Sequence, residues 1–282
     1  VGEIIKVGSE VTAFKVGDLA GVGCFVDSCR TCPSCQKGLE QYCEVGMVGT
    51  YNSKDKQGNP TYGGYSNLIT VDEKYTLKVS PKLDLAGVAP LLCAGLATFN
   101  AMRKSGALAG DLVAIQGIGG LGHLALQFAR AWGCEVTAFT SSESKRDEAM
   151  ALGAHRVVSS TDPKSMKAVA GQLDMVLVTV NVMLNWKALM STLAPNGRLH
   201  LVGILPQPME VEAFPLIGGQ RSVSGSPTGS RQDIDTMLAF AARHGIEPQT
   251  EHYPMSRINE ALDHLRAGKA RYRVVLDADA AP

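Results

Sequence analysis

The chain has 282 residues, which at roughly 150 residues per domain predicts about two domains. Its 27 Lys and Arg residues equal its 27 Asp and Glu residues in number, so the formal net charge is zero. This balance, without any local basic cluster, argues against a protein that binds nucleic acid through a bulk positive field. The chain is 45% apolar and 19% charged, which is close to the ordinary globular mixture and excludes global disorder.

No apolar run approaches the roughly 18 to 20 residues that span a bilayer, and no basic and apolar leader opens the sequence. We therefore expect a soluble, cytoplasmic protein without a membrane partner. The chain opens at Val1, inside a strand-like run and without an initiator Met. This opening is consistent with a missing N-terminal segment.

Short strands separated by Gly, Asp and Asn turns are predicted before residue 90, at residues 3–7, 19–26, 64–71 and 77–79. Between the second and third of these lies a loop with four closely spaced cysteines: Cys29, Cys32, Cys35 and Cys43. Four thiolates at these spacings can close a tetrahedron around zinc, and a closed tetrahedron has no position for water or substrate. The loop therefore predicts a structural zinc site. Reduced, unpaired cysteines are the alternative, but four thiols in a polar loop have no packing rationale.

The other three cysteines are predicted to be packing residues. Cys24 lies in an apolar strand-like run, and Cys134 follows a Trp-Gly pair. Cys93 lies in the apolar segment 89–95, which enters a helix, where a cysteine is most often a small buried hydrophobe. An odd total of seven cysteines without a secretory signal argues against a disulfide framework.

A buried strand over residues 111–116 is followed by a glycine-rich turn that fits G-x-G-x-x-G. The turn comprises Gly117, Ile118, Gly119, Gly120, Leu121 and Gly122. Apolar residues then recur on one face of a helix as far as residue 132, and a second strand covers residues 135–139. Strand, glycine turn, helix and strand in this order predict a dinucleotide site, with the pyrophosphate at the helix N-terminus.

The end of the second strand predicts which dinucleotide is bound. NAD sites usually have an acidic residue there, which accepts a hydrogen bond from the ribose 2′-OH. This chain instead continues Thr140, Ser141, Ser142, Glu143, Ser144, Lys145 and Arg146. The hydroxyls can donate to a 2′-phosphate and the two cations can neutralise it, so we predict NADP(H). Two alternatives are that Glu143 reaches a bare ribose, and that the cations are only the solvated first turn of a helix that ends near Gly153.

Four more strands continue the alternation, at residues 156–158, 174–180, 198–203 and 222–226, and a last helix ends near Gly245. Six strands with intervening helices predict an α/β fold, a doubly wound parallel Rossmann sheet over residues 96–246. Ligands bind beyond the carboxyl ends of such strands. The residues expected near the nicotinamide are therefore Thr179, Val180, Gly203, Ile204, Gly225 and Ser226.

The C-terminal segment contains an amphipathic helix around residues 258–265 and a strand at residues 272–276. We expect residues 247–282 to return to residues 1–95 and complete a discontinuous β-rich domain beside the sheet.

Taken together, these motifs make the chain resemble the zinc-containing medium-chain alcohol dehydrogenases, most closely their cinnamyl-alcohol-dehydrogenase-like, NADP-dependent aldehyde reductase branch. The resemblance covers nearly the whole chain and rests on residues 23–29, 63–66, 90–95, 117–123, 140–146 and 272–275. It implies that the β-rich domain is GroES-like and that Cys93 is a catalytic residue and a ligand of a catalytic zinc. It also makes Thr98 a candidate for a nicotinamide contact, although Ala97 stands where the family often has a hydroxyl residue. The family further implies a homodimer, formed through the sheet edge at residues 222–225.

The resemblance also implies zinc ligands upstream of Val1, in a Cys segment and a Gly-His-Glu segment that this chain lacks. Cys93 alone cannot hold a catalytic zinc, which needs three protein ligands. We therefore expect an enzyme with an incomplete active site, which with its missing segment interconverts small-molecule aldehydes and primary alcohols. The alternatives are a non-catalytic NADP-binding protein stapled by zinc, and a zinc-free quinone or enoyl reductase, which generally lacks the four-Cys loop.

Overall fold

The computed structural model describes residues 1–279. The chain divides into two compact units, residues 1–96 with residues 228–282, and residues 97–227. The first division lies within one residue of the predicted domain boundary. The second places helix α9 (Arg231–His244) in the first unit, whereas the sequence predicted it as the last helix of the nucleotide domain.

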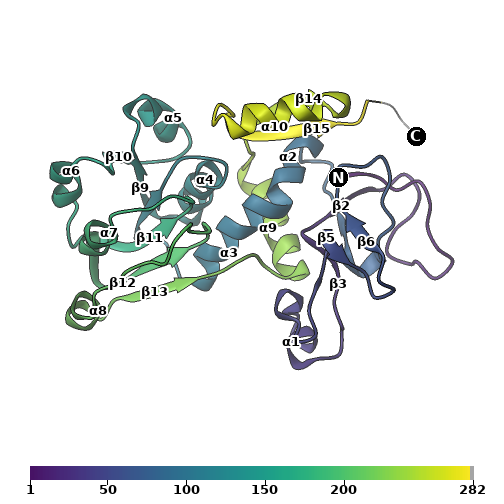
Figure 1. Cartoon of the computed structure of the whole chain (residues 1–282), viewed down its shortest axis with the longest axis horizontal. Helices are drawn as coiled ribbons and strands as arrows, with labels where there is room; N and C mark the ends of the chain where they lie inside the picture. The colour runs from purple at the N-terminus through teal and green to yellow at the C-terminus, as the bar shows by residue number, and fades with distance from the viewer. Residues whose placement is uncertain (280–282) are drawn as a thin grey trace. The chain divides into compact units, whose positions relative to one another are not determined.

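The second unit contains a six-stranded parallel sheet, and this confirms the predicted fold (Figure 1). The order of the strands across the sheet is β10-β9-β8-β11-β12-β13. The chain builds the sheet outward from β8 in one direction and then from β11 in the other, as a doubly wound sheet requires. The strands are β8 (Leu112–Gln116), β9 (Glu135–Thr140), β10 (Arg156–Ser159), β11 (Leu173–Val178), β12 (Leu193–Leu201) and β13 (Ser222–Gly225).

Helices cover the sheet because each parallel connection must cross over it. Right-handed crossovers put α4 and α5, which lead away from β8 in one direction, on the face opposite α7 and α8, which lead away in the other. The helices of this unit are α3 (Leu96–Lys104, which begins at the boundary), α4 (Gly122–Trp132), the short η4 (Glu143–Lys145), α5 (Arg146–Ala151), α6 (Pro163–Ala168), α7 (Trp186–Thr192) and α8 (Ala213–Gly219).

Burial on both faces explains the strand sequences. The central strand β11 is almost wholly inaccessible from Leu173 to Val178, and Val113, Ala114 and Ile115 of β8 are fully buried. Continuous apolar runs of this kind are typical of parallel strands with helices on each side. The α4 helix ends at Gly133, whose positive φ of 93° closes it.

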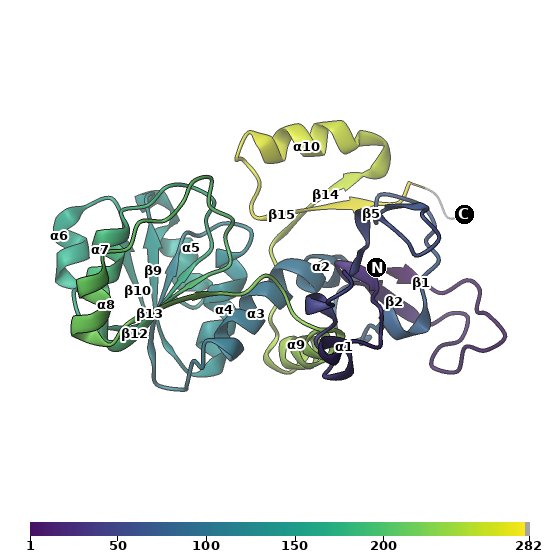
Figure 2. The ribbon, with the colours of Figure 1, turned by 60° about the horizontal axis from the view of Figure 1, so that its bottom comes forward.

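The first unit consists of small antiparallel sheets, a helical part and a C-terminal layer. Figure 2 shows α10 lying over the parallel pair β14 and β15. Its strands are β1 (Gly2–Glu3), β2 (Leu19–Val22), β3 (Phe25–Asp27), β4 (Val48–Gly49), β5 (Tyr51–Lys54), β6 (Pro60–Tyr62), β7 (Thr76–Lys78), β14 (Thr250–Pro254) and β15 (Arg273–Asp277). Its other helical elements are α1 (Pro33–Gln36), η1 (Glu40–Tyr42), η2 (Glu73–Tyr75), α2 (Leu85–Pro90), the π-helical turn η3 (Leu91–Gly95), η5 (Met255–Arg257) and α10 (Ile258–Arg266).

The strand predictions in this unit were partly wrong. Of residues 3–7 only Glu3 lies in a strand, and the run at residues 19–26 is divided between β2 and β3. Residues 64–71 form no strand, and their apolar side chains Tyr65, Leu68 and Ile69 are exposed. The hairpin of β5 and β6 was missed, although Asp55, which accepts hydrogen bonds from the backbone N–H groups of residues 57 and 59, makes a recognisable turn. Residues 64–71 contain aromatic and β-branched side chains typical of strands, but a strand also needs a partner.

The expectation that no apolar run is long enough to span a bilayer was also wrong. The stretch Leu85–Lys104, through α2, η3 and α3, is long and apolar enough, alone among the helices of residues 1–279. However, 78% of its 18-residue window is buried inside the protein. Burial of this kind identifies a core helix, which satisfies the same length and composition test.

Candidate cofactor and metal sites

The four cysteines of the predicted zinc loop converge. Cys29 follows β3, Cys32 caps α1, Cys35 lies within α1 and Cys43 follows η1. Their Sγ atoms all lie within 4.8 Å of one another, and those of Cys29 and Cys35 are 3.9 Å apart. Sulfurs about 2.3 Å from a tetrahedral zinc are about 3.8 Å from each other. The donor set therefore fits a closed zinc site.

Backbone N–H groups favour the thiolate forms that a metal binds. The N–H of Cys32 lies 3.3 Å from Cys29 Sγ, and the N–H of Cys35 lies 3.5 Å from Cys32 Sγ. The N–H groups of Thr31 and Cys32 lower the pKa of Cys29 to about 6, and N–H donors likewise lower the pKa of Cys32. Burial instead raises the pKa of Cys35 to about 11. The backbone of the loop thus favours the thiolate that a metal binds at Cys29 above all.

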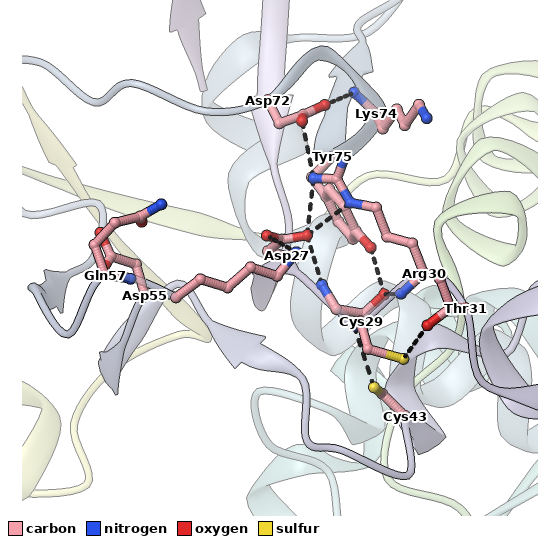
Figure 3. Close-up of polar contacts among 12 residues, drawn as sticks. Asp27, Cys29, Arg30, Thr31, Cys43, Asp55, Gln57, Asp72, Lys74 and Tyr75 are labelled. Carbon is pink, nitrogen blue, oxygen red and sulfur yellow. Dashed lines mark hydrogen bonds and ion pairs between the residues drawn. The ribbon is translucent and has the colours of Figure 1, made fainter.

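An arginine holds the start of this loop, as Figure 3 shows. The Nε of Arg30 donates to Asp27 Oδ1 and its Nη2 to Asp72 Oδ2, each at 2.8 Å, while its guanidinium lies 5.3 Å from the centre of the Tyr75 ring. The Tyr75 hydroxyl lies 2.7 Å from Ser28 Oγ. Arg30 itself has a φ of 67°, so the network holds an uncommon backbone conformation next to the first zinc ligand. Sequence reasoning did not find this residue.

The three motif glycines of the second unit have the geometry that a tight, phosphate-binding turn requires. Gly117 has a φ of 92°, as a tight turn requires, and a Cβ there would come within 2.0 Å of Val180 Cγ1. A Cβ on Gly122 would lie 1.8 Å from the Gly117 oxygen, so only glycine lets α4 start so close to β8. Gly119, by contrast, has nothing within 4 Å of its Cβ position. That open backbone at a helix N-terminus fits a pyrophosphate.

The polar segment after β9 reaches the same turn. The Nζ of Lys145 donates to the Ile118 carbonyl at 2.6 Å, so its charge is held against the glycine-rich turn. Arg146 is paired with Glu143, and this ion pair is exposed. The Thr140 hydroxyl is buried and accepts from the backbone N–H of Ser142 at 3.1 Å. Of the two cations, Lys145 is therefore the one held against the turn, and the acidic Glu143 already has a partner.

The residues predicted at the carboxyl ends of the strands are brought together in part. The Thr179 hydroxyl lies 3.0 Å from the Gln116 carbonyl and 2.9 Å from that of Gly117, so it braces the glycine turn. Gly203 lies so close to Val180 that a Cβ would be 2.1 Å from the Val180 oxygen. The remaining members differ in exposure: Ile204 is 87% exposed, Gly225 is exposed, Ser226 is half-buried and Thr98 is fully buried.

Cys93 lies in η3 and is exposed. A hydrogen bond with Cys24 lowers the pKa of Cys93 to about 6, and the same contact together with burial raises the pKa of Cys24. Local sequence context predicted both as core residues, the family resemblance made Cys93 a zinc ligand, and neither found their pairing. Cys134, in contrast, is buried as predicted. Within residues 1–279, the zinc loop is the one group of three or more His, Cys, Asp or Glu side chains that can share an ion. The described residues around Cys93 therefore do not fit a three-ligand catalytic zinc.

Comparison with known proteins identifies the family of this chain. Residues 1–81 match the model of the alcohol dehydrogenase GroES-like domain, and residues 120–243 match that of the zinc-binding dehydrogenases. An NADP-dependent alcohol dehydrogenase of Mycolicibacterium smegmatis is 45% identical over 98% of this chain and 79% of its own length.

Two solved structures are similar along the same stretch. A cinnamyl alcohol dehydrogenase from Sorghum bicolor has a TM-score of 0.94 and 41% identity, covering 98% of this chain and 79% of its own. One from Helicobacter pylori, complexed with NADP(H), has a TM-score of 0.89 and 38% identity over the same shares. The chain belongs to the zinc-containing medium-chain alcohol dehydrogenases, in the cinnamyl-alcohol-dehydrogenase-like branch.

Proposed function

We propose that the protein is an NADP(H)-dependent alcohol dehydrogenase that interconverts small-molecule aldehydes and primary alcohols. The observation that carries the proposal is Lys145, held 2.6 Å from the Ile118 carbonyl at a glycine turn whose Gly119 backbone is open. The relatives are named as dehydrogenases, which favours this function over a binding protein without catalysis.

We infer that the cofactor is held by three groups of residues within the second unit. The turn supplies the pyrophosphate contacts, the segment after β9 supplies those to the 2′-phosphate, and the carboxyl ends of the strands lie toward the nicotinamide. The set is Thr98, Gly117, Ile118, Gly119, Gly120, Leu121, Gly122, Thr140, Ser141, Ser142, Lys145, Arg146, Thr179, Val180, Gly203, Ile204, Gly225 and Ser226. When bound, the nicotinamide supplies or accepts hydride, and the protein orients it.

A direct test is to titrate the protein with NADPH and NADH and to follow oxidation of NADPH with aromatic and aliphatic aldehydes. We expect NADPH to bind more tightly than NADH, because Lys145 gains a phosphate partner only with NADPH. Equal affinity for the two would overturn the assignment of the 2′-phosphate site. An absence of turnover with every aldehyde, in protein that binds NADPH and retains zinc, would overturn the proposed reaction.

We assign the structural zinc to Cys29, Cys32, Cys35 and Cys43, whose geometry suits it. We also propose that Cys93 is one ligand of a catalytic zinc whose other ligands the described residues do not supply, from the family membership and its exposed thiol with a pKa of about 6. Metal analysis of protein that contains two zinc ions per chain separates the two assignments. In such protein, loss of about one zinc per chain in a Cys93→Ser variant supports the second, whereas retention of both ions contradicts it.

The homodimer is a further proposal, through β13 at the sheet edge. An edge strand has unpaired backbone groups, and nearby Phe214 and Ile217 are 80% and 76% exposed. A molar mass in solution equal to that of one chain, measured by light scattering, would refute the dimer. We propose a cytoplasmic location, which the reduced four-thiol loop favours.

We propose that residues 96–246 form the dinucleotide-binding domain, defined by the family match and not by the compact units of the structure. The family model over residues 120–243 includes α9, although α9 packs with the first unit.

A further inference from the structure

A buried histidine links two serines next to the nicotinamide side of the proposed cofactor site. His200, in β12, is only 2% exposed. Its Nδ1 lies 2.9 Å from Ser224 Oγ and its Nε2 lies 2.9 Å from Ser226 Oγ. Both ring nitrogens are therefore used by hydroxyl groups on or next to the neighbouring strand.

The sheet register explains how one ring reaches both serines. β12 and β13 are parallel, with His200 opposite Ser224 and Leu201 opposite Gly225. Side chains two residues apart along a strand point to the same face, so Ser224 and Ser226 lie on one side. The N–H of Ser226 donates to the Leu201 carbonyl at 3.1 Å, which fixes its backbone just past the end of β13. Ser224 is thus inside the strand, and Ser226 is beyond it.

The ring limits what the Ser226 hydroxyl can do. Burial, and then the nearby Arg198 guanidinium, lower the pKa of His200 below its usual value, so the ring is neutral at physiological pH. A neutral imidazole has one N–H donor and one acceptor nitrogen. One serine must therefore accept from the ring while the other donates to it. The Ser226 hydroxyl is held in place by the ring, and two of its three hydrogen-bonding sites remain for other partners.

The location gives this arrangement a role. Ligands of open parallel sheets bind beyond the carboxyl ends of the strands, and Ser226 is the first residue after one of them. A free serine side chain would sample several rotamers and lose that freedom on binding.

We propose that His200 is a positioning residue for NADP(H), which acts through Ser226 at the nicotinamide end of the site. This inference rests on the proposed cofactor site. Ser224 anchors the far side of the ring and has no contact with the cofactor.

Two substitutions of His200 separate its two contacts. An asparagine amide reaches about as far as Nδ1 and keeps the Ser224 contact, whereas a glutamine amide reaches about as far as Nε2 and keeps the Ser226 contact. Ser224→Ala and Ser226→Ala form the matched pair on the other side. Affinity is measured for NADPH and for 2′-phospho-ADP-ribose, which lacks the nicotinamide, and thermal unfolding is recorded for each variant.

We expect His200→Asn and Ser226→Ala to weaken NADPH binding by roughly 5- to 10-fold, as the loss of one positioned hydrogen bond would. His200→Gln and Ser224→Ala should bind NADPH within about twofold of the unaltered protein. All four should bind 2′-phospho-ADP-ribose normally, which a general loss of structure would not permit. Should both His200 variants fail to fold, the two serine variants still make the comparison.

Equal NADPH affinities for His200→Asn and His200→Gln would overturn the inference, as would equal losses for the two serine variants. A parallel loss for 2′-phospho-ADP-ribose would show a structural role instead. Failure of the unaltered protein to bind either ligand would defeat the proposed function itself, together with the inference that rests on it.

Discussion

The charge of Lys145 offers the sharpest test of cofactor choice. In Lys145→Met the side chain keeps its apolar stem but loses the ammonium group that lies 2.6 Å from the Ile118 carbonyl. A charge-assisted hydrogen bond to a phosphate contributes about 1.5–3 kcal/mol, which corresponds to a roughly 10- to 150-fold weaker NADPH complex. Because the ammonium is already held against the glycine turn, little side-chain entropy is lost when the phosphate binds. We therefore expect a loss of NADPH affinity in the upper part of this range.

NADH provides the internal control, since it lacks the 2′-phosphate. Loss of the Ile118 contact alone should weaken NADH by about fivefold or less, which is about 1 kcal/mol. Arg146→Met is the matched variant, because Arg146 is exposed and engaged by Glu143, and such surface pairs contribute little. Both dissociation constants are measured by fluorescence titration at two salt concentrations, and the NADPH preference should shrink at high salt. Equal losses of NADPH and NADH affinity in Lys145→Met, or a larger change of preference in Arg146→Met, would refute the reasoning.

Three other outcomes are expected. Cys32→Ser should lose the structural zinc and lower the melting temperature, because structural zinc sites contribute folding free energy directly; unchanged metal content and an unchanged melting curve would contradict this. Gly122→Ala should destabilise the fold by about 1–3 kcal/mol in melting curves, because its Cβ would lie 1.8 Å from the Gly117 oxygen. Gly119→Ala, whose Cβ position is open, should fold normally but bind NADPH less well in a titration. The Lys74 backbone N–H and then Arg30 hold the pKa of Asp72 below its usual value, so its contribution to stability is present above about pH 4 and lost as the pH falls through that lowered value. In Asp72→Asn, the free energy of unfolding should depend less on pH in this acidic range, as denaturation measured at a series of pH values will show.

The sheet of the second unit was predictable because its physics is local. Strands buried on both faces read as continuous apolar runs, such as β11, and Gly133 marks the end of α4 as a helix stop does. The glycine turn likewise has its meaning in a few consecutive residues. The first unit was harder to predict, since its strands are two to five residues long and depend on which segment pairs with which. Residues 64–71 contain aromatic and β-branched side chains typical of strands yet form no strand.

The site residues divide along the same line. Cys29 and its three companions, and Lys145, could be named from spacing and from position after a strand. The pairing of Cys24 with Cys93 could not, because it joins residues from different elements. For His200 a weak signal existed in the alternating serines of β13, but only the register of β12 against β13 shows that one imidazole bridges two of them.

The proposed cofactor site has a common physical logic at its two ends. At one end the Lys145 ammonium is held by a backbone carbonyl of the turn, and at the other the Ser226 hydroxyl is held by His200. In both cases the polar group is ordered by the protein before a ligand arrives, so binding does not require it to give up freedom at that moment. Lys145 distinguishes NADPH from NADH through charge, whereas a hydroxyl fixed by a neutral ring can only affect orientation. Substitutions at the first end should therefore change which cofactor is chosen, and substitutions at the second should change how tightly the nicotinamide half is held without changing that choice.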